Sequence, residues 1–386
     1  MKKICFVNPS YIKKNTGGAE VQIFLLAREF LKSGWQVFYL TEDVSEKEVD
    51  NGINLIPFNY NENDCIQDVY SSMSRILRDI DADVYYQRGR KKYTYLLQRF
   101  SSEYNKLFIF ASSMDLDCKM LKESFRNITI MTLPKKILTF PKNFQLDIQT
   151  LRAIKKSNLV LSQTNNQKVW FKKNLNIDSI VFPNVHEIPE TKIKKNSEPP
   201  IILWLANIKE WKQPEIFLAL VEHLHQMDCK FIMAGKIIDE KYRIGIVNTE
   251  KKYSNFHYIE EVPFEKSNEL IQSASIFINT SKLNEGFPNT FIQAWMRCTP
   301  VISLNHDPDD LIKKEKIGFH SKSFHQLIID TKILITNPEL RIIMGKKARD
   351  YSISQFSINQ CNVLIKIFDE LRENGTGIGP SCDHSD

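Results

Sequence analysis

Short apolar runs alternate along the chain with longer segments in which apolar residues recur every three or four positions. Residues 4–7 form the first apolar run, which predicts a buried parallel strand. A polar loop leads to Gly17 and Gly18, a helical pattern continues to Gly34, and residues 36–40 predict the next strand. This βαβ opening lacks the spaced G-x-G-x-x-G of dinucleotide-binding folds, which argues against a nicotinamide cofactor.

The same alternation continues through the first half of the chain. Apolar runs predict strands over 53–57, 84–86, 107–110 and 159–162, and helical patterns cover 68–80 and 167–173. Residues 119–150 follow neither period clearly, and no element is predicted there.

A stretch rich in Pro, Lys and Glu separates two halves of similar size. Residues 183–186 close the first half, and residues 187–200 have the composition of an interdomain linker. Strands are then predicted over 201–205, 230–234, 257–259, 275–279 and 299–304, and helices over 214–226, 267–273, 339–352 and 359–371. The tail 373–386 carries Gly and Ser and has little to bury, so we expect disorder there. The pattern predicts two doubly wound α/β halves.

The composition is that of a soluble globular protein with room for two cores. The 386 residues are 42% hydrophobic and 25% charged, with a net charge of +6. Such a charge suits an acidic ligand or an anionic membrane surface and does not by itself indicate nucleic acid. The seven cysteines are scattered singly, so we expect reduced thiols in a cytoplasmic protein and no metal site. No apolar stretch approaches the length of a membrane span.

One stretch, residues 284–295, combines the end of a strand, a tight polar turn and the start of a helix. Gly286 permits a close turn, and Pro288 suits the first helical turn, where a missing N–H costs nothing. The N–H groups at the start of the helix point at whatever lies above the turn, an arrangement that binds anions and phosphate above all. Glu285 places a carboxylate just ahead of that helix.

The second half resembles the C-terminal domain of the family 4 glycosyltransferases, which are retaining enzymes that use nucleotide-sugar donors. The segments that carry the resemblance are Glu285-Gly286-Phe287-Pro288-Asn289, Pro300-Val301-Ile302-Ser303, Trp204-Leu205-Ala206-Asn207 and Lys212-Gln213-Pro214-Glu215. Pro183-Asn184 and Gly17-Gly18-Ala19-Glu20 also fall where that family places them. The resemblance is strong over residues 201–352, moderate over 1–40 and thin between.

The resemblance implies the GT-B fold, with two Rossmann-like α/β/α domains that face each other across a cleft. Residues 1–186 would form the acceptor-binding domain, 187–200 the linker and 201–358 the nucleotide-sugar-binding domain. A C-terminal helix over 359–372 would pack back on the N-terminal domain, ahead of the tail 373–386.

The resemblance also assigns roles to single residues. The diphosphate of a nucleotide sugar gains negative charge as the glycosidic bond breaks, and without a metal that charge is met by helix N-termini and by Lys or Arg. Lys212 matches the family's diphosphate lysine, and Glu285 matches the glutamate that holds the sugar hydroxyls. The full set expected to bind the donor is Asn207, Lys209, Lys212, Glu285, Gly286, Phe287, Pro288, Asn289 and Gln293.

Three positions depart from the family pattern. The acidic residue that grips the ribose is replaced by Gln293, which lacks the charge of a carboxylate, so we expect weaker ribose binding. Asn207 stands where an arginine is common, with Lys209 as its candidate substitute. No histidine precedes His186, and Asp115 is the candidate for the position of the family's N-terminal histidine. The expected catalytic set is thus Glu285, Lys212 and Asp115.

Each of these residues also has an ordinary structural interpretation. Alone, Glu285 would be a solvated loop carboxylate and Lys212 a surface lysine, but the motif favours function for both. For Gln293, an exposed helix residue is an equally good interpretation. Gly17 and Gly18 fit a plain turn and helix cap, although contact with an acceptor or a phosphate is slightly favoured.

The remaining residues of note near the motif receive ordinary roles. Phe291 and Trp295 are predicted to pack in the core. His306 and His320 are assigned no function.

Residues 88–100 mix basic and aromatic side chains in the first half of the chain. A solvated helix with one apolar face inward is the favoured interpretation. The alternative is a patch that includes Arg88, Arg90, Lys91 and Lys92, docks on anionic lipid and presents a lipid-linked acceptor.

The expected function is transfer of a sugar from a nucleotide-diphosphate sugar to a glycan or polyprenyl-linked acceptor, in cell-surface polysaccharide biosynthesis. The reaction would retain the anomeric configuration and use no metal or other cofactor. The protein would be cytoplasmic, with peripheral contact at the inner membrane face as an open hypothesis, and without a nucleic-acid partner. Two alternatives remain: a glycosyltransferase-like protein that binds nucleotide or glycan without turnover, and a GT-B sugar-nucleotide epimerase.

Overall fold

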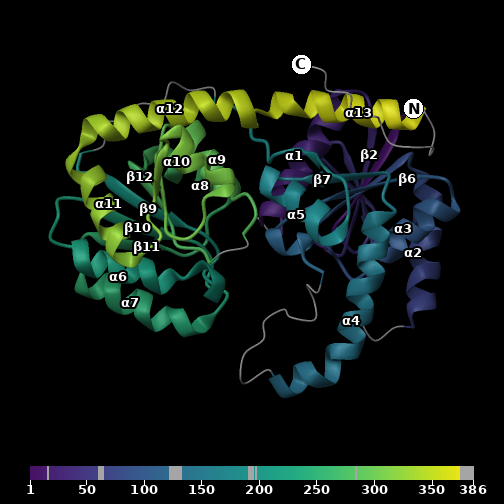
Figure 1. Ribbon diagram of the computed structural model, residues 1–386, viewed down its shortest axis with the longest axis horizontal. Helices are drawn as coiled ribbons and strands as arrows, with labels where there is room; N and C mark the ends of the chain where they lie inside the picture. The colour runs from purple at the N-terminus through teal and green to yellow at the C-terminus, as the bar shows by residue number, and fades with distance from the viewer. Residues whose placement is uncertain are drawn as a thin grey trace. The chain divides into compact units, whose positions relative to one another are not determined.

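The computed structural model describes residues 1–14, 17–59, 65–120, 133–189, 195, 198–282 and 285–373, without the side chains of 133–139 and Glu265. The chain forms two compact units (Figure 1). Unit 1 comprises Met1–Pro183 and the segment that starts at Ile358, and unit 2 comprises Asn184–Ser357. Of the predicted tail 373–386, Glu373 ends the last helix, and residues 374–386 lie outside the described residues.

Unit 1 contains a sheet that is parallel except for one edge strand. Its strands are β1 (Lys3–Val7), β2 (Gln36–Thr41), β3 (Glu48–Asp50), β4 (Ile53–Pro57), β5 (Val84–Arg88), β6 (Leu107–Ala111), β7 (Leu159–Ser162) and β8 (Ile180–Val181). They lie in the order β3-β4-β2-β1-β5-β6-β7-β8, and β3 pairs with β4 in the antiparallel sense. Its helices are α1 (Gly18–Lys32), α2 (Ile66–Ile80), α3 (Thr94–Glu103), α4 (Leu133–Lys155), α5 (Asn165–Leu175) and α13 (Cys361–Glu373), with the short 3-10 helix η1 (Asp115–Cys118).

Unit 2 contains a parallel sheet in the order β11-β10-β9-β12-β13-β14. Its strands are β9 (Ile201–Leu205), β10 (Lys230–Ala234), β11 (Phe256–Ile259), β12 (Ile276–Asn279), β13 (Val301–Ser303) and β14 (Gly318–His320). Its helices are α6 (Pro214–Leu224), α7 (Arg243–Lys252), α8 (Phe264–Ser273), α9 (Asn289–Met296), α10 (Leu311–Glu315), α11 (Phe324–Thr336) and α12 (Pro338–Phe356). The 3-10 helices η2 (Glu210–Lys212), η3 (Glu240–Tyr242) and η4 (Pro308–Asp310) lie in its loops.

Helices cover both faces of the unit 2 sheet, which explains why its strands are continuous apolar runs. On one face, α6, α7 and α11 pack on the sheet around Phe217, Leu220 and Leu327. On the other face, α8, α9, α10 and α12 pack around Phe291 and Trp295. Phe291 and Trp295 are fully buried, so their predicted place in the core is confirmed.

The elements predicted from periodicity agree with the structure, and the structure adds others. The predicted strands 53–57, 159–162, 201–205 and 230–234 match β4, β7, β9 and β10 residue for residue. The prediction missed α4, which overlaps the second half of the unassigned region 119–150. It also missed α11, which precedes α12. Every described cysteine is a free thiol, as expected.

The predicted linker 187–200 belongs to unit 2 where it is described. Lys195 donates hydrogen bonds to the carbonyls of Ile271, Gln272 and Ala274 at the end of α8, at 2.6–3.1 Å. Glu198 pairs with Arg341 of α12. The chain passes from unit 1 to unit 2 between Pro183 and Asn184. No helix among the described residues is long and apolar enough to cross a membrane.

Candidate functional site

The sheet of unit 2 brings two loops together at the point where its strand order reverses. β9 and β12 are hydrogen-bonded neighbours, but the chain runs from β9 to β10 on one side and from β12 to β13 on the other. In open α/β sheets, ligands bind outside the carboxyl ends of the strands at such a switch point. The loops that follow β9 and β12 are therefore the place to look for a site.

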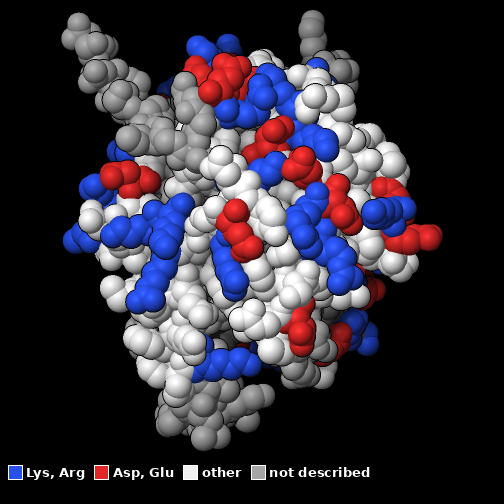
Figure 2. Space-filling model, turned by 90° about the vertical axis from the view of Figure 1, so that its right-hand side faces the viewer, with Lys and Arg blue, Asp and Glu red and all other residues white. Residues whose placement is uncertain are grey.

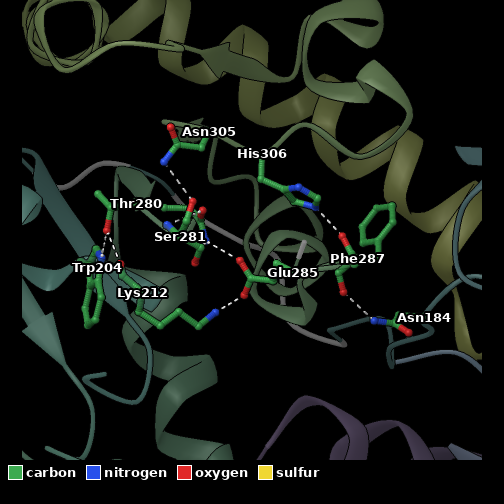
Figure 3. Close-up of polar contacts among 11 residues, drawn as sticks. Asn184, Trp204, Lys212, Thr280, Ser281, Glu285, Phe287, Asn305 and His306 are labelled. Carbon is green, nitrogen blue, oxygen red and sulfur yellow. Dashed lines mark hydrogen bonds and ion pairs between the residues drawn. The ribbon is translucent and has the colours of Figure 1, made fainter. Parts of the chain in front are cut away.

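Lys212 and Glu285 form an ion pair at this edge, with Lys212 Nζ beside Glu285 Oε1 (Figure 3). Their side chains are only 14% and 8% exposed. The amide nitrogen of Asn279, at the end of β12, donates to the other carboxylate oxygen at 3.4 Å. The two residues that the sequence expected in one site, 73 positions apart, thus lie in contact.

The Glu285 carboxylate is held in its charged form. Burial alone would raise the pKa of this carboxyl, because a charge loses hydration in the interior. The charge of Lys212 and its hydrogen bond, together with the nearby His306 and Ser281, outweigh burial and lower the pKa below its usual value of 4.5. An ionised carboxylate only accepts hydrogen bonds, so Glu285 offers two acceptor oxygens at this edge of the sheet.

The backbone of Lys212 is held by Thr280, which is itself held by Trp204. The hydroxyl of Thr280, after β12, donates to the carbonyl of Lys212 at 2.7 Å and accepts from Trp204 Nε1 at 2.8 Å. On the outside, the ammonium of Lys212 lies 4.0 Å from the centroid of the Trp211 ring. The Lys212 ammonium is therefore placed by packing as well as by its charge partner.

The turn after Glu285 joins the site to the core. Gly286 adopts a φ of 79°, in the left-handed region that favours glycine. Phe287 is buried against Phe356, with ring centroids 5.0 Å apart, so its ring belongs to the core. The amide of Asn184 donates to the Phe287 carbonyl at 2.8 Å and to Asn289 Oδ1 at 2.9 Å. Helix α9 starts directly after Pro288.

Gln293 lies in α9 and is engaged within unit 2. It is 4% exposed, so the interpretation as an exposed helix residue is wrong. Its amide nitrogen donates to Asn268 Oδ1 of α8 at 3.0 Å. The amide nitrogen therefore already has a partner.

Asn207 and Lys209 lie in the loop after β9, both half-buried. Lys209 Nζ is 5.0 Å from the Trp211 ring centroid, on the same ring that Lys212 contacts. The loop passes close to Gly235, where a Cβ atom would lie 1.9 Å from the carbonyl oxygen of Ala206. Only glycine at this position lets the two strand ends approach so closely.

Gly17, Gly18 and Asp115 belong to unit 1. Gly17 caps α1, and Gly18 is the first residue of that helix. Asp115 lies in η1 and accepts a hydrogen bond from Gln167 Nε2 at 2.9 Å, with 7% of its surface exposed. Its carboxylate thus has a structural partner within unit 1.

The two arginines of the lipid-docking patch considered for residues 88–100 are buried, so that interpretation is wrong for them. Arg88, at the end of β5, is 3% exposed, and Arg90 is 5% exposed. Arg90 forms an ion pair with Asp147 of α4 at 2.8 Å. Buried guanidinium groups cannot contact a membrane surface. Figure 2 shows the side of the molecule where α2 and α3 lie in Figure 1, and there acidic side chains are interspersed among basic ones.

Several residues that shape the site were not predicted. They are Asn184, Trp211, Thr280, Asn305 and His306. Thr280 and His306 follow predicted strands, so the carboxyl-end rule for parallel sheets places them at the correct edge. Asn184 belongs to the Pro183-Asn184 segment that matches the family, but no local pattern predicts its tertiary contact with the Phe287 carbonyl.

The site combines an ammonium, a carboxylate, side-chain amides and the start of a helix. Such a set suits a ligand with an anionic part and a part rich in hydroxyl groups. Within the part of the chain that the structure describes, no three His, Cys, Asp or Glu side chains are grouped so as to hold a metal ion.

Residues 187–351 match the model of the family described as glycosyl transferases group 1. Among curated protein sequences, none is similar enough to count as a match. The fold resembles sucrose-phosphate synthase from Thermosynechococcus elongatus, with a TM-score of 0.76 and 10% identity over 97% of this chain and 100% of that chain. It also resembles a glycosyltransferase from Rickettsia africae, with a TM-score of 0.71 and 18% identity over 97% and 99% of the two chains.

A third solved structure is the Anabaena protein HepE in complex with UDP and glucose. Its TM-score is 0.70 at 12% identity, over 96% of this chain and 100% of that chain. At such identities the likeness establishes the fold, which confirms the predicted GT-B class with two Rossmann-like domains. The chain therefore has the fold of the GT-B glycosyltransferases, and residues 187–351 carry the glycosyl transferases group 1 match.

Proposed function

We propose that the protein is a retaining, metal-independent glycosyltransferase that uses a nucleotide-diphosphate sugar and a glycan or polyprenyl-linked acceptor of cell-surface polysaccharide synthesis. The observation that carries the proposal is the Lys212–Glu285 ion pair at the switch point of unit 2. The family match of residues 187–351 supports it, as does the presence of UDP and glucose in the HepE complex. The same proposal places the protein in the cytoplasm, with the acceptor bound by unit 1.

In this proposal the two charged residues act on opposite ends of the donor. Lys212 leaves Glu285 and pairs with the diphosphate, whose negative charge grows as the bond from the anomeric carbon to the phosphate oxygen breaks. Glu285 accepts hydrogen bonds from the sugar hydroxyls and orients the ring. The acceptor oxygen bonds to the anomeric carbon on the same face, and its proton passes to the leaving phosphate.

Lys209 and Asn207 line the diphosphate side of the site in this proposal, and the Gly286–Phe287 backbone lies at the start of α9 beside it. Gln293 Oε1 would accept from the ribose, because the amide nitrogen already donates to Asn268. Gly17 and Gly18 of unit 1 contribute acceptor or phosphate contact, and Asp115 remains the proposed catalytic residue of that unit.

The test begins with a thermal-shift screen against a panel of nucleotide sugars, followed by assays with the best donor. We expect Glu285→Gln to reduce kcat by at least about 100-fold, since it removes a charged acceptor from the reacting sugar. The matched control is Glu222→Gln. It removes an exposed carboxylate of α6 that is paired with Lys252 of α7. Near-normal turnover of Glu285→Gln would refute the site.

Product analysis separates the remaining functions. A new glycosidic bond with retained configuration, formed in the presence of EDTA, supports the proposal, whereas inverted configuration or loss of activity with EDTA contradicts it. An isomerised sugar without a new bond would indicate an epimerase.

One observation favours a second candidate, a nucleotide-binding or glycan-binding protein without turnover. The ribose position is occupied by Gln293, whose amide is tied to Asn268 rather than being a free carboxylate. Calorimetric binding of UDP or GDP, with no transfer to any lipid or glycan acceptor, would support this candidate.

A further inference from the structure

Asn305, two residues after β13, ties together the two loops of the site. Its amide nitrogen donates to Gln213 Oε1 at 3.1 Å. It also donates to the carbonyl of Ser281 at 3.2 Å (Figure 3). Gln213 follows Lys212 directly and has a φ of 49°, a left-handed conformation that costs energy for a residue other than glycine. Surrounding contacts must therefore hold it, and Asn305 is one of them. Asn305 thus holds the side chain of Gln213, the residue next to Lys212.

His306 contacts the other loop of the site. It is 7% exposed, and its Nε2 atom contacts the carbonyl oxygen of Gly286. Because a carbonyl oxygen only accepts hydrogen bonds, Nε2 carries the hydrogen. A peptide group is planar, so holding this carbonyl fixes the peptide plane that follows Gly286. Figure 3 shows the imidazole and the amide of Asn184 on opposite sides of the turn.

The two neighbours differ in the member of the ion pair whose next residue they contact. Asn305 holds the residue after Lys212, and His306 holds the residue after Glu285. His306 also lies close enough to Glu285 for its charge to help lower the pKa of that carboxyl. His320 and Asp307 are the other titratable groups near His306, and they lie 3.9 Å apart.

We infer that Asn305 and His306 are positioning residues for two separate parts of the donor, Asn305 for the diphosphate through Lys212 and His306 for the sugar through Glu285. This inference rests on the proposed function. It predicts that loss of one residue harms recognition of the nucleotide and loss of the other harms recognition of the sugar.

The experiment compares the binding of a nucleoside diphosphate with that of its sugar conjugate. Calorimetry with UDP, GDP, ADP and their glucose conjugates is carried out on wild type, Asn305→Leu, His306→Leu and His306→Gln. Asn305→Leu removes the hydrogen bonds to Gln213 and to the Ser281 carbonyl. It should weaken binding of the nucleoside diphosphate itself by about tenfold. His306→Leu should leave that affinity within about threefold, yet lower kcat by about tenfold because Glu285 is misplaced.

The conservative variant distinguishes positioning from general support of the fold. In His306→Gln the side-chain amide can still donate to the Gly286 carbonyl, so sugar-dependent affinity and kcat should recover to within about threefold of wild type. His257→Leu is the matched control, because His257 is exposed in β11 of the same unit. Near-UV circular dichroism and melting temperature show whether a variant has folded, and Asn305→Ser and His306→Met replace any Leu variant that has not.

The outcomes distinguish failure of the proposed function from failure of the positioning roles alone. If wild type binds none of the probes, the proposed function fails and the inference fails with it. If wild type binds a probe but the two Leu variants weaken diphosphate and sugar recognition equally, or change neither, the inference alone is wrong. Failure of His306→Gln to restore kcat also overturns it.

Discussion

His186 is a buried ionisable residue whose titration should govern how unit 2 responds to acid. Its side chain is 3% exposed, and its backbone N–H donates to the carbonyl of Phe356 at 2.8 Å. Burial, the largest cause, and the positive charge of Arg297 lower the pKa of the imidazole from 6.5 to about 3. A hydrogen bond with Asn289 raises the pKa but does not offset these two effects. The folded protein therefore keeps His186 neutral at pH values where the unfolded chain protonates it.

This difference fixes the sign of the pH dependence. Between about pH 6.5 and 3 the unfolded chain binds the proton and the folded chain does not, so the free energy of unfolding falls as the pH drops through this window. At pH 5 the loss attributable to His186 should be about 2 kcal/mol relative to neutral pH. The free energy of unfolding in urea is measured at pH 7.5 and pH 5. Between these pH values it should fall by about 2 kcal/mol less in His186→Gln than in wild type. His257→Gln, which removes an exposed histidine, should keep the wild-type pH dependence, and equal pH dependence in both variants would contradict the assignment.

The site residues that could be predicted are those whose chemistry lies in a local pattern. Glu285 precedes a turn and a helix, and Lys212 precedes a helix that starts with proline. These patterns, together with the family resemblance, marked both residues as candidates, and the structure brings them into contact. Asn184 and His306 could not be found in this way, because they contact the backbone of a distant turn through hydrogen bonds that any polar residue can make. Gln293 was identified, but its burial depends on α8, which its own pattern does not describe.

At the scale of elements, the packing of α12 against the end of α9 depends on Gly345. A Cβ atom there would lie 2.2 Å from the carbonyl oxygen of Cys298, which follows α9, and backbone cannot swing aside as a side chain can. Gly345→Ala should therefore push α12 away from α9 and lower the free energy of unfolding by about 1–3 kcal/mol. Chemical denaturation followed by circular dichroism measures this change.

The matched control is another glycine within a helix of the same unit. A Cβ at Gly245 of α7 would meet only Leu218 Cδ1, at an ordinary 3.6 Å. Gly245→Ala should therefore be neutral or stabilise by up to about 1 kcal/mol, since alanine favours helices. If both variants have the same effect, the packing of α12 on α9 is not the cause.

Periodicity predicts elements well where one face is apolar or a strand is fully buried, as in β4, β7, β9 and β10. It failed for α11, whose 13 residues are apolar on most sides and gave no clear face. It also failed for α4, which contains Pro141 within the helix and whose position rests on contacts such as Arg90 to Asp147. Both failures arise where tertiary packing, rather than local pattern, decides the structure.

At the scale of the whole molecule, unit 1 is built from both ends of the chain. The chain leaves unit 1 at Pro183 and returns at Ile358. Helix α13 then packs on α1, with the rings of Phe368 and Phe30 5.5 Å apart. Its periodicity predicts a helix, but which unit it joins follows from these contacts and not from the pattern.

This arrangement predicts that a substitution near the C-terminus destabilises the N-terminal unit. Phe368 is fully buried, so Phe368→Ala should lower the stability of unit 1 by about 3–5 kcal/mol. Val363, on the same helix, is 56% exposed, and Val363→Ala should change stability by no more than about 0.5 kcal/mol. Hydrogen exchange measured by mass spectrometry should show faster exchange in β1 and α1 of Phe368→Ala, with β9 and β12 unchanged. Faster exchange confined to unit 2 would mean that α13 supports the other unit, because only the unit that loses the buried ring should open more often.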